Sequence, residues 1–157
     1  MFVESNAYDE GSMIPPRFAT RKVAGGTGAS VPLRWENEPA GTRSYVLTMI
    51  DHHPVAHEWL HWLVVDIPLG AHELPEGASR TGAMPAGAME LGNTGGRAGY
   101  GGPQPPVGSG PHRYEVTIHA LDVPRLGVHA DATLGEVRAA MHGHVLGTAS
   151  LTGYFEQ

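Results

Sequence analysis

Residues 112–121 alternate between apolar or aromatic side chains and polar ones, and this period of two constrains the fold more than any other feature of the chain. An alternation of this length is typical of a β-strand that buries one face, because successive side chains of a strand point to opposite sides. We therefore expect a β-rich fold in which His112 and Tyr114 point inward. The side chains predicted on the inward face are His112, Tyr114, Val116, Ile118 and Ala120.

Two further segments are predicted as strands because β-branched and aromatic residues dominate them. Residues 43–51 are apolar on both faces, which indicates a central strand, and residues 59–67 form a second apolar run. Shorter strands are expected within residues 30–36 and 148–154. On the 59–67 strand, the side chains expected on one face are Trp59, His61, Leu63 and Val65.

A single helix is predicted, over residues 134–141. Thr133 and Glu136 have the spacing of a capping box, in which the side chain of each residue accepts a hydrogen bond from the backbone of the other. A chain of 157 residues with 41% hydrophobic content is long enough for one core and too short for two. The sequence therefore predicts one domain over residues 1–157, mainly all-β, with one or two short peripheral helices.

The composition excludes several classes of function. The chain has no cysteine, so disulfides, thiolate zinc sites and cysteine nucleophiles are excluded. A net charge of −6 with a single lysine, Lys22, leaves no basic stripe for nucleic acid, although one pocket can still be locally positive. No apolar run approaches the ~18 residues that span a bilayer, and the start of the chain is acidic where a signal peptide is basic. We therefore expect a cytoplasmic protein without a transmembrane segment.

The segment from residue 70 to residue 110 is a long Gly/Pro-rich excursion that holds twelve of the 22 glycines. Structureless loops of this length in a compact domain are usually either disordered or functional. Residues 99–106 favour function, because their glycines permit close backbone approach to a ligand and their prolines stiffen the rest.

His57, Glu58 and His61 match the H-E-x-x-H pattern of zinc peptidases, in which a helix brings both histidines to one metal ion. Here Pro54 precedes the motif and a strand-like run follows it, so the context predicts a turn into a strand. In a strand the two histidines would lie about 13 Å apart, which is too far for one zinc ion. A zinc metallopeptidase is therefore the less favoured alternative, and we expect no metal site.

Five motifs in this chain stand in the order found in the phosphatidylethanolamine-binding proteins, and together they span the chain from about Ser5 to Tyr154. The chain resembles this family, and in particular its bacterial Raf-kinase-inhibitor-like group. The resemblance implies an antiparallel β-sandwich with short peripheral helices. The motifs lie at residues 44–51, 61–68, 99–106, 110–114 and 144–154.

The resemblance also implies a ligand cavity but no catalytic residue and no cofactor. One departure from the family is visible, because the family usually reads Asp-Pro-Asp-Ala-Pro where this chain has Asp51, His52, His53 and Pro54. Two outcomes stay open: either His52 or His53 replaces the second aspartate at the rim, or that contact is lost. The ligand-binding residues implied by the resemblance are Asp51, His61, Gly102, Pro103, His112 and Tyr114.

The chemistry of these residues suits a phosphate-like anion, because imidazoles, a phenol and backbone N–H groups all donate hydrogen bonds. A carboxylate such as Asp51 beside His61 or His112 would favour the imidazolium form and leave the other ring nitrogen facing the ligand. We expect these three residues in one hydrogen-bonded cluster, bordered by the backbone of residues 101–103. A simpler alternative is that both histidines are hydrogen-bonded core residues.

The predicted function is non-enzymatic binding of a phosphate-like small molecule or a phospholipid headgroup. The resemblance adds a protein partner such as a kinase, and a homodimer. The alternative is a hydrolase in which Asp51, His61 and His112 act as acid–base groups. A hydrolase also needs a nucleophile or a metal-bound water near these histidines, and the sequence assigns neither.

Overall fold

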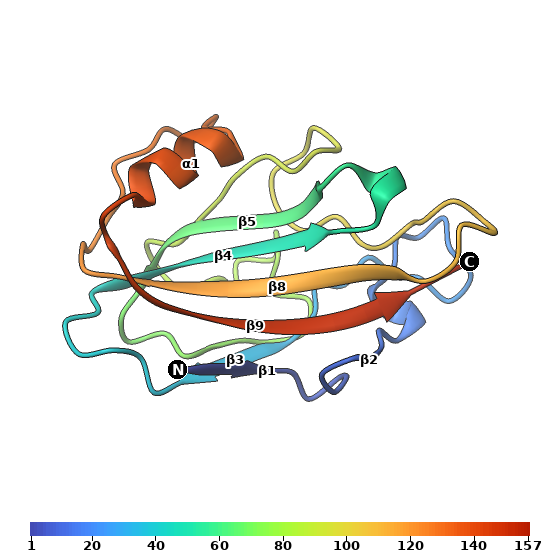
Figure 1. Ribbon diagram of the computed structural model, residues 1–157, viewed down its shortest axis with the longest axis horizontal. Helices are drawn as coiled ribbons and strands as arrows, with labels where there is room; N and C mark the ends of the chain where they lie inside the picture. Colours follow the sequence, from blue (N-terminus) through green and yellow to red (C-terminus); the bar gives the residue numbers. More distant parts are fainter.

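Two β-sheets dominate the computed structural model, which describes residues 1–157 (Figure 1). The larger sheet has the strand order β2-β9-β8-β4-β5-β7, and the smaller has the order β1-β3-β6. The strands of the larger sheet are β2 (Ser12–Met13), β4 (Ser44–Asp51), β5 (Trp59–Pro68), β7 (Met89–Glu90), β8 (His112–Leu121) and β9 (Val145–Phe155). Those of the smaller sheet are β1 (Phe2–Glu4), β3 (Leu33–Glu36) and β6 (Glu73–Leu74).

The predicted β class is confirmed, and β4, β5 and β8 lie within one residue of their expected bounds. All eight residues of β4 are buried, because this strand lies between β5 and β8 and is covered on both faces. Neighbouring strands pair antiparallel as expected, except that β2 and β9 pair in parallel over two residues. The helix α1 (Leu134–Met141) begins with the predicted capping box of Thr133 and Glu136. Two short 3₁₀ turns, η1 (Pro16–Phe18) and η2 (Pro54–Ala56), complete the elements.

The face predicted for β5 is only partly right: Leu63 and Val65 share a core, but a β-bulge shifts the alternation before them. Ile50 of β4 pairs with Leu60, whereas the preceding Met49 pairs with Trp62, so His61 is the extra residue. The ring of His61 consequently lies beside Tyr114, with the ring centroids 5.1 Å apart. The side chains of β5 then divide between two cores: Leu60, Leu63 and Val65 in one, and Trp62, Val64 and Ile67 in the other.

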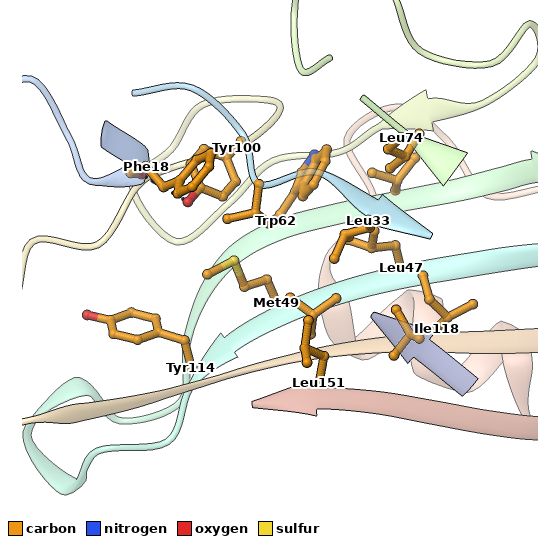
Figure 2. Packing of buried hydrophobic residues seen from close by; sticks show 14 of the residues in the cluster. Phe18, Leu33, Leu47, Met49, Trp62, Leu74, Tyr100, Tyr114, Ile118 and Leu151 are labelled. Carbon is orange, nitrogen blue, oxygen red and sulfur yellow. Dashed lines mark hydrogen bonds between the residues drawn. The ribbon is translucent and has the colours of Figure 1, made fainter. Parts of the chain in front are cut away.

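The larger core draws side chains from both sheets, so the small sheet covers one face of the large one. In Figure 2, Leu33 and Leu74 of the small sheet lie across from Leu47 and Ile118 of the large sheet. The smaller core lies on the other face, where Val137 of α1 packs with residues of β4 and β5. With both faces of its centre buried, the large sheet provides a rigid base for side chains at the ends of its strands.

Candidate functional site

Three neighbouring strands bring four of the predicted site residues to one end of the large sheet. Asp51 is the last residue of β4, and its cross-strand neighbour in β8 is Tyr114, two residues after His112. His61 enters from β5 on the other side of β4. All four are nearly inaccessible to solvent, with exposures of 3% for Asp51, 5% for His61 and 1% for His112 and Tyr114.

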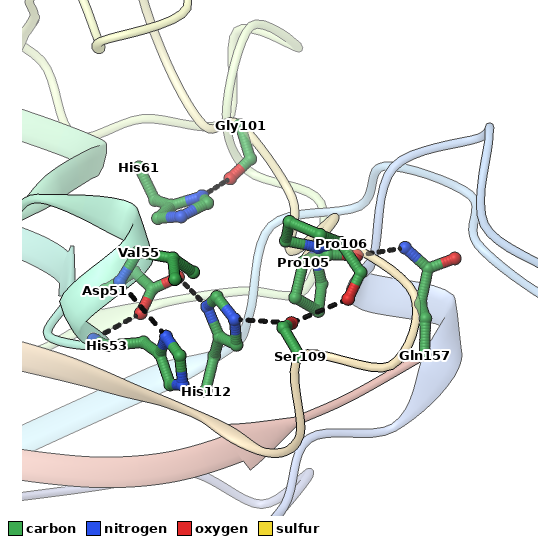
Figure 3. Close-up of polar contacts among 10 residues, drawn as sticks. All are labelled: Asp51, His53, Val55, His61, Gly101, Pro105, Pro106, Ser109, His112 and Gln157. Carbon is green, nitrogen blue, oxygen red and sulfur yellow. Dashed lines mark hydrogen bonds and ion pairs between the residues drawn. The ribbon is translucent and has the colours of Figure 1, made fainter.

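The carboxylate of Asp51 fixes the ring of His112 (Figure 3). Nδ1 of His112 donates a hydrogen bond to Oδ2 of Asp51 at 2.6 Å, in a fully buried contact. The other oxygen, Oδ1, accepts a hydrogen bond of 2.8 Å from the backbone N–H of His53. Both carboxylate oxygens are therefore occupied, and Asp51 orients its neighbours instead of facing a ligand.

The second nitrogen of His112 does not face the cavity freely, which differs from the prediction. Nε2 lies 2.9 Å from Oγ of Ser109, and the same hydroxyl lies 2.6 Å from the carbonyl oxygen of Pro106. Because a serine hydroxyl has one hydrogen, it can donate to only one of these partners. If it donates to Pro106, His112 must donate from Nε2 and is an imidazolium; if it donates to Nε2, His112 is neutral.

His61 forms a separate hydrogen-bonded group, so the prediction of one cluster is wrong. Its Nδ1 donates to the carbonyl oxygen of Gly101 at 2.6 Å, and the Gly101 N–H donates to the His61 carbonyl oxygen at 2.8 Å. Burial lowers the pKa of His61, and the bond to Gly101 and the charge of Asp51 oppose this only in part. Of the two histidines that Asp51 was expected to contact, it contacts His112. The lowered pKa of His61 favours the neutral ring, and its Nε2 makes no hydrogen bond within the chain.

The hydroxyl of Tyr114 is buried near the carboxylate of Asp51 and makes no well-formed hydrogen bond within the chain. Burial raises the pKa of Tyr114 far above its usual value, and the nearby charge of Asp51 raises it further. The phenol therefore keeps its proton and remains a hydrogen-bond donor. Buried polar groups are nearly always paired, so an unpaired hydroxyl at the end of the sheet needs an explanation.

The glycine-rich loop approaches so closely that only glycine fits at position 102. A Cβ atom at Gly102 would lie 2.5 Å from the carbonyl oxygen of Phe18 and 2.7 Å from the backbone nitrogen of Thr20. The N–H of Gly102 makes no hydrogen bond within the chain, whereas the carbonyl oxygen of Pro103 accepts one of 3.1 Å from Thr20. Gly102 lines the cavity described below, but Pro103, which was predicted there, does not; Pro105 is among the residues that do.

The carboxylate of Glu90 helps to fix the glycine-rich segment next to His61. Oε1 of Glu90 accepts hydrogen bonds from Nε1 of Trp62 at 2.8 Å and from Oγ of Ser79 at 2.6 Å. The guanidinium of Arg80 donates to the carbonyl oxygens of Ala98 and Tyr100. These contacts attach the long loop to β5 and position the carbonyl oxygen of Gly101 for His61.

The site residues open onto a cavity of about 860 Å³. Five of the six predicted residues line it, and so do four cations that the sequence did not single out. The cations lie in loops, where no periodicity relates them to the strands that carry the histidines. Asp51 is the one carboxylate in the lining. The four cations are Arg21, Lys22, Arg80 and Arg97.

The H-E-x-x-H residues form a turn into a strand, as predicted, and not a helix. His57 and Glu58 have positive φ angles of 50° and 55°, and β5 begins at the next residue. The two histidines that follow Asp51 have different neighbours. His53 stacks on His112 with the ring centroids 3.9 Å apart, whereas His52 points to Glu115. Of the two, His53 contacts a site residue, but neither histidine lines the cavity.

Comparisons with known proteins agree with this architecture. The sequence profile of the phosphatidylethanolamine-binding protein family matches residues 4–156. The UPF0098 protein YbhB of Escherichia coli is 38% identical over 154 residues, which cover 96% of this chain and 97% of YbhB. LppC of Mycobacterium tuberculosis, named as a candidate lipoprotein, is 34% identical and is covered over 71% of its length, with 98% of this chain matched.

A solved structure is similar over almost the whole chain. The crystal structure of Escherichia coli YbcL, described as a new member of the mammalian PEBP family, superposes with a TM-score of 0.90 at 31% identity, covering 99% of this chain and 98% of YbcL. The profile match and the identity to YbhB both extend across the strands that carry the site. The chain belongs to the phosphatidylethanolamine-binding protein family.

Proposed function

We propose that the cavity binds a phosphate-like anion, either a phosphorylated small molecule or a phospholipid headgroup, without changing it chemically. One observation carries this proposal: Tyr114 lines a cavity, and its buried hydroxyl has no hydrogen-bond partner in the chain. A bound anion would accept its hydrogen bond and remove the cost of burying an unpaired polar group. The four cations in the lining supply an attractive field on a chain whose net charge is −6.

Three groups at the site can contact the anion. Tyr114 supplies its O–H, and Gly102 supplies an N–H that makes no hydrogen bond within the chain. His61, neutral and with a free Nε2, accepts a hydrogen bond from a protonated phosphate oxygen, or donates one after it takes up a proton. The site therefore accommodates both ionisation states of a phosphate monoester.

Calorimetric titration with inorganic phosphate and with phosphoethanolamine tests the proposal. Saturable binding of phosphate with one site per chain is the expected result, together with chemical-shift changes confined to residues around Tyr114, Gly102 and His61. Absence of binding at millimolar concentrations of both compounds would contradict it. A structure with bound phosphate would then identify the donors directly.

A second candidate function, ester hydrolysis, is favoured by the contact between Ser109 and His112. The order Asp51–His112–Ser109, with hydrogen-bond distances of 2.6 and 2.9 Å, has the donor and acceptor roles of a nucleophilic triad. Oγ of Ser109 would attack the ester carbonyl carbon while its proton passes to Nε2 of His112. The leaving alkoxide would take that proton, and water would release the acid from acyl-Ser109.

Labelling with a fluorophosphonate probe, which reacts covalently with activated serines, distinguishes the two functions. A catalytic Ser109 gives a labelled chain, and labelling is lost in Ser109→Ala but kept in Ser150→Ala, which changes an exposed serine. An unlabelled wild-type chain that still binds phosphate leaves anion binding as the function.

The domain organisation, the sandwich arrangement of the sheets, the cellular location and the partners are proposed together with anion binding. We treat residues 1–157 as one domain in which the two sheets form a β-sandwich, supported by the core that both sheets share. None of the helices has the length and apolar character that crossing a bilayer requires. A homodimer and a protein partner such as a kinase are proposed from the family resemblance, and location in the cytoplasm is proposed from the sequence alone.

A further inference from the structure

Several cations of this chain lie around one cavity. The chain has ten lysine and arginine residues, and four of them line the cavity. Elsewhere Arg17, Arg34 and Arg113 form salt bridges with glutamates, but none of the four cavity cations pairs with a carboxylate. The positive charge around the cavity is therefore not neutralised within the molecule.

Two of the four cations make no side-chain hydrogen bond within the chain. Arg80 is engaged by two carbonyl oxygens of the glycine-rich segment, and Nε of Arg21 donates to the carbonyl oxygen of Thr27. The side chains of Lys22 and Arg97 make no hydrogen bond or salt bridge and are exposed at the edge of the cavity. They come from segments more than 70 positions apart in the chain, Lys22 following η1 and Arg97 lying in the glycine-rich segment.

The cavity offers little to a positively charged ligand group. Its one carboxylate, Asp51, is buried, and both of its oxygens already accept hydrogen bonds from His112 and His53. An ammonium group in the cavity would therefore meet Lys22 and Arg97 without a free carboxylate to offset them. A second anionic group would instead find two unpaired cations.

We propose that Lys22 and Arg97 form a second anion subsite at the rim, so that the cavity prefers phosphates carrying another negative charge over zwitterionic phosphate esters. The inference rests on the proposed function, because the first phosphate occupies the buried donors of Tyr114 and Gly102. Preferred ligands are bisphosphates and phosphorylated carboxylic acids. Since both cations are exposed, the preference is modest, about three- to tenfold at low salt, and it decreases as salt increases.

Phosphoglycolate and phosphoethanolamine make a matched pair of probes, because they are similar in size and differ in the charge of the group beyond the phosphate. Calorimetric titrations of both compounds and of inorganic phosphate, in 20 mM and 200 mM salt, measure the preference directly. Wild-type protein should bind phosphoglycolate about three- to tenfold more tightly than phosphoethanolamine in low salt. The double variant Lys22→Gln/Arg97→Gln should reduce this ratio to about one and still bind inorganic phosphate.

The control is Arg43→Gln/Arg125→Gln, which removes the same charge from exposed positions outside the cavity lining. Equal affinity for the two probes, or tighter binding of phosphoethanolamine, overturns the subsite. Binding of inorganic phosphate in the same experiment would still support the proposed function. An equal loss of preference in the control overturns it as well, because the effect would then come from net charge. If neither phosphate nor phosphoglycolate binds, the proposed function fails and the subsite fails with it.

Discussion

Replacing Tyr114 with Phe removes one buried oxygen atom, and we expect ligand affinity and protein stability to change in opposite directions. The hydroxyl is unpaired in the free protein, and leaving such a group buried costs about 1–3 kcal/mol. Its removal keeps the ring and its packing in the core, so the free energy of unfolding should rise by ~1 kcal/mol. With a urea m-value near 2 kcal/mol/M, the unfolding midpoint should rise by about 0.5 M.

In the complex the same hydroxyl donates to an anion, and hydrogen bonds to charged groups contribute about 1.5–3 kcal/mol. Phosphate affinity in Tyr114→Phe should therefore fall by about ten- to a hundredfold. Calorimetric titration and urea unfolding of the same protein preparation measure both effects. A variant that is more stable and binds phosphate more weakly is the combination that the site predicts.

Tyr8→Phe is a matched control, because the hydroxyl of Tyr8 is also buried and unpaired but the residue does not line the cavity. It should stabilise the protein and leave phosphate affinity unchanged. Unchanged phosphate affinity in a folded Tyr114→Phe protein would refute the role of this hydroxyl. A clear loss of stability in that variant would show that the hydroxyl has a structural partner in solution.

Three further predictions follow from the geometry. Gly102→Ala should lower the free energy of unfolding by about 1–3 kcal/mol in urea titrations, since its Cβ would lie 2.5 Å from backbone atoms that cannot easily move; a neutral result would contradict the close approach. Burial lowers the pKa of His61 in the folded state, so the unfolded chain binds a proton first as pH falls. Stability should thus be full above about pH 6.5 and decline below it, less steeply in His61→Gln. Light scattering should give twice the chain mass of 16.6 kDa, and a monomer mass would end the dimer proposal.

Much of the fold could be predicted because alternating apolar and polar residues identify both a strand and the face that it buries. The alternation over residues 112–121 placed His112 and Tyr114 correctly, and the Thr133–Glu136 spacing identified the one α-helix. The face of β5 could not be predicted, because a bulge at His61 interrupts a period that the sequence itself continues without a break. The bulge depends on how β5 pairs with β4, and the sequence of one strand alone does not determine that pairing.

The site residues on strands were predicted, but of the loop residues discussed above only Gly102 was predicted and lines the cavity. Asp51 and His112 were identified together, but Ser109 was not, because nothing in a Gly/Pro-rich loop indicates that a hydroxyl contacts Nε2 of that histidine. Arg97 and Lys22 were missed for the same reason. Loop positions converge through turns and carbonyl contacts, such as that between Thr20 and Pro103, whose geometry has no sequence period.

The two candidate functions differ in where they need the proton shared by His112 and Ser109. Anion binding is helped when the hydroxyl donates to Pro106, because His112 is then an imidazolium and adds positive charge beside the cavity. Nucleophilic attack requires the hydroxyl to donate to Nε2, because only a neutral imidazole can accept the serine proton. Nitrogen NMR of labelled histidine separates the two states, since an imidazolium has two protonated ring nitrogens. An imidazolium at pH 7.5, unchanged by phosphate, would leave Ser109 without a base and reduce the contact to an orienting role.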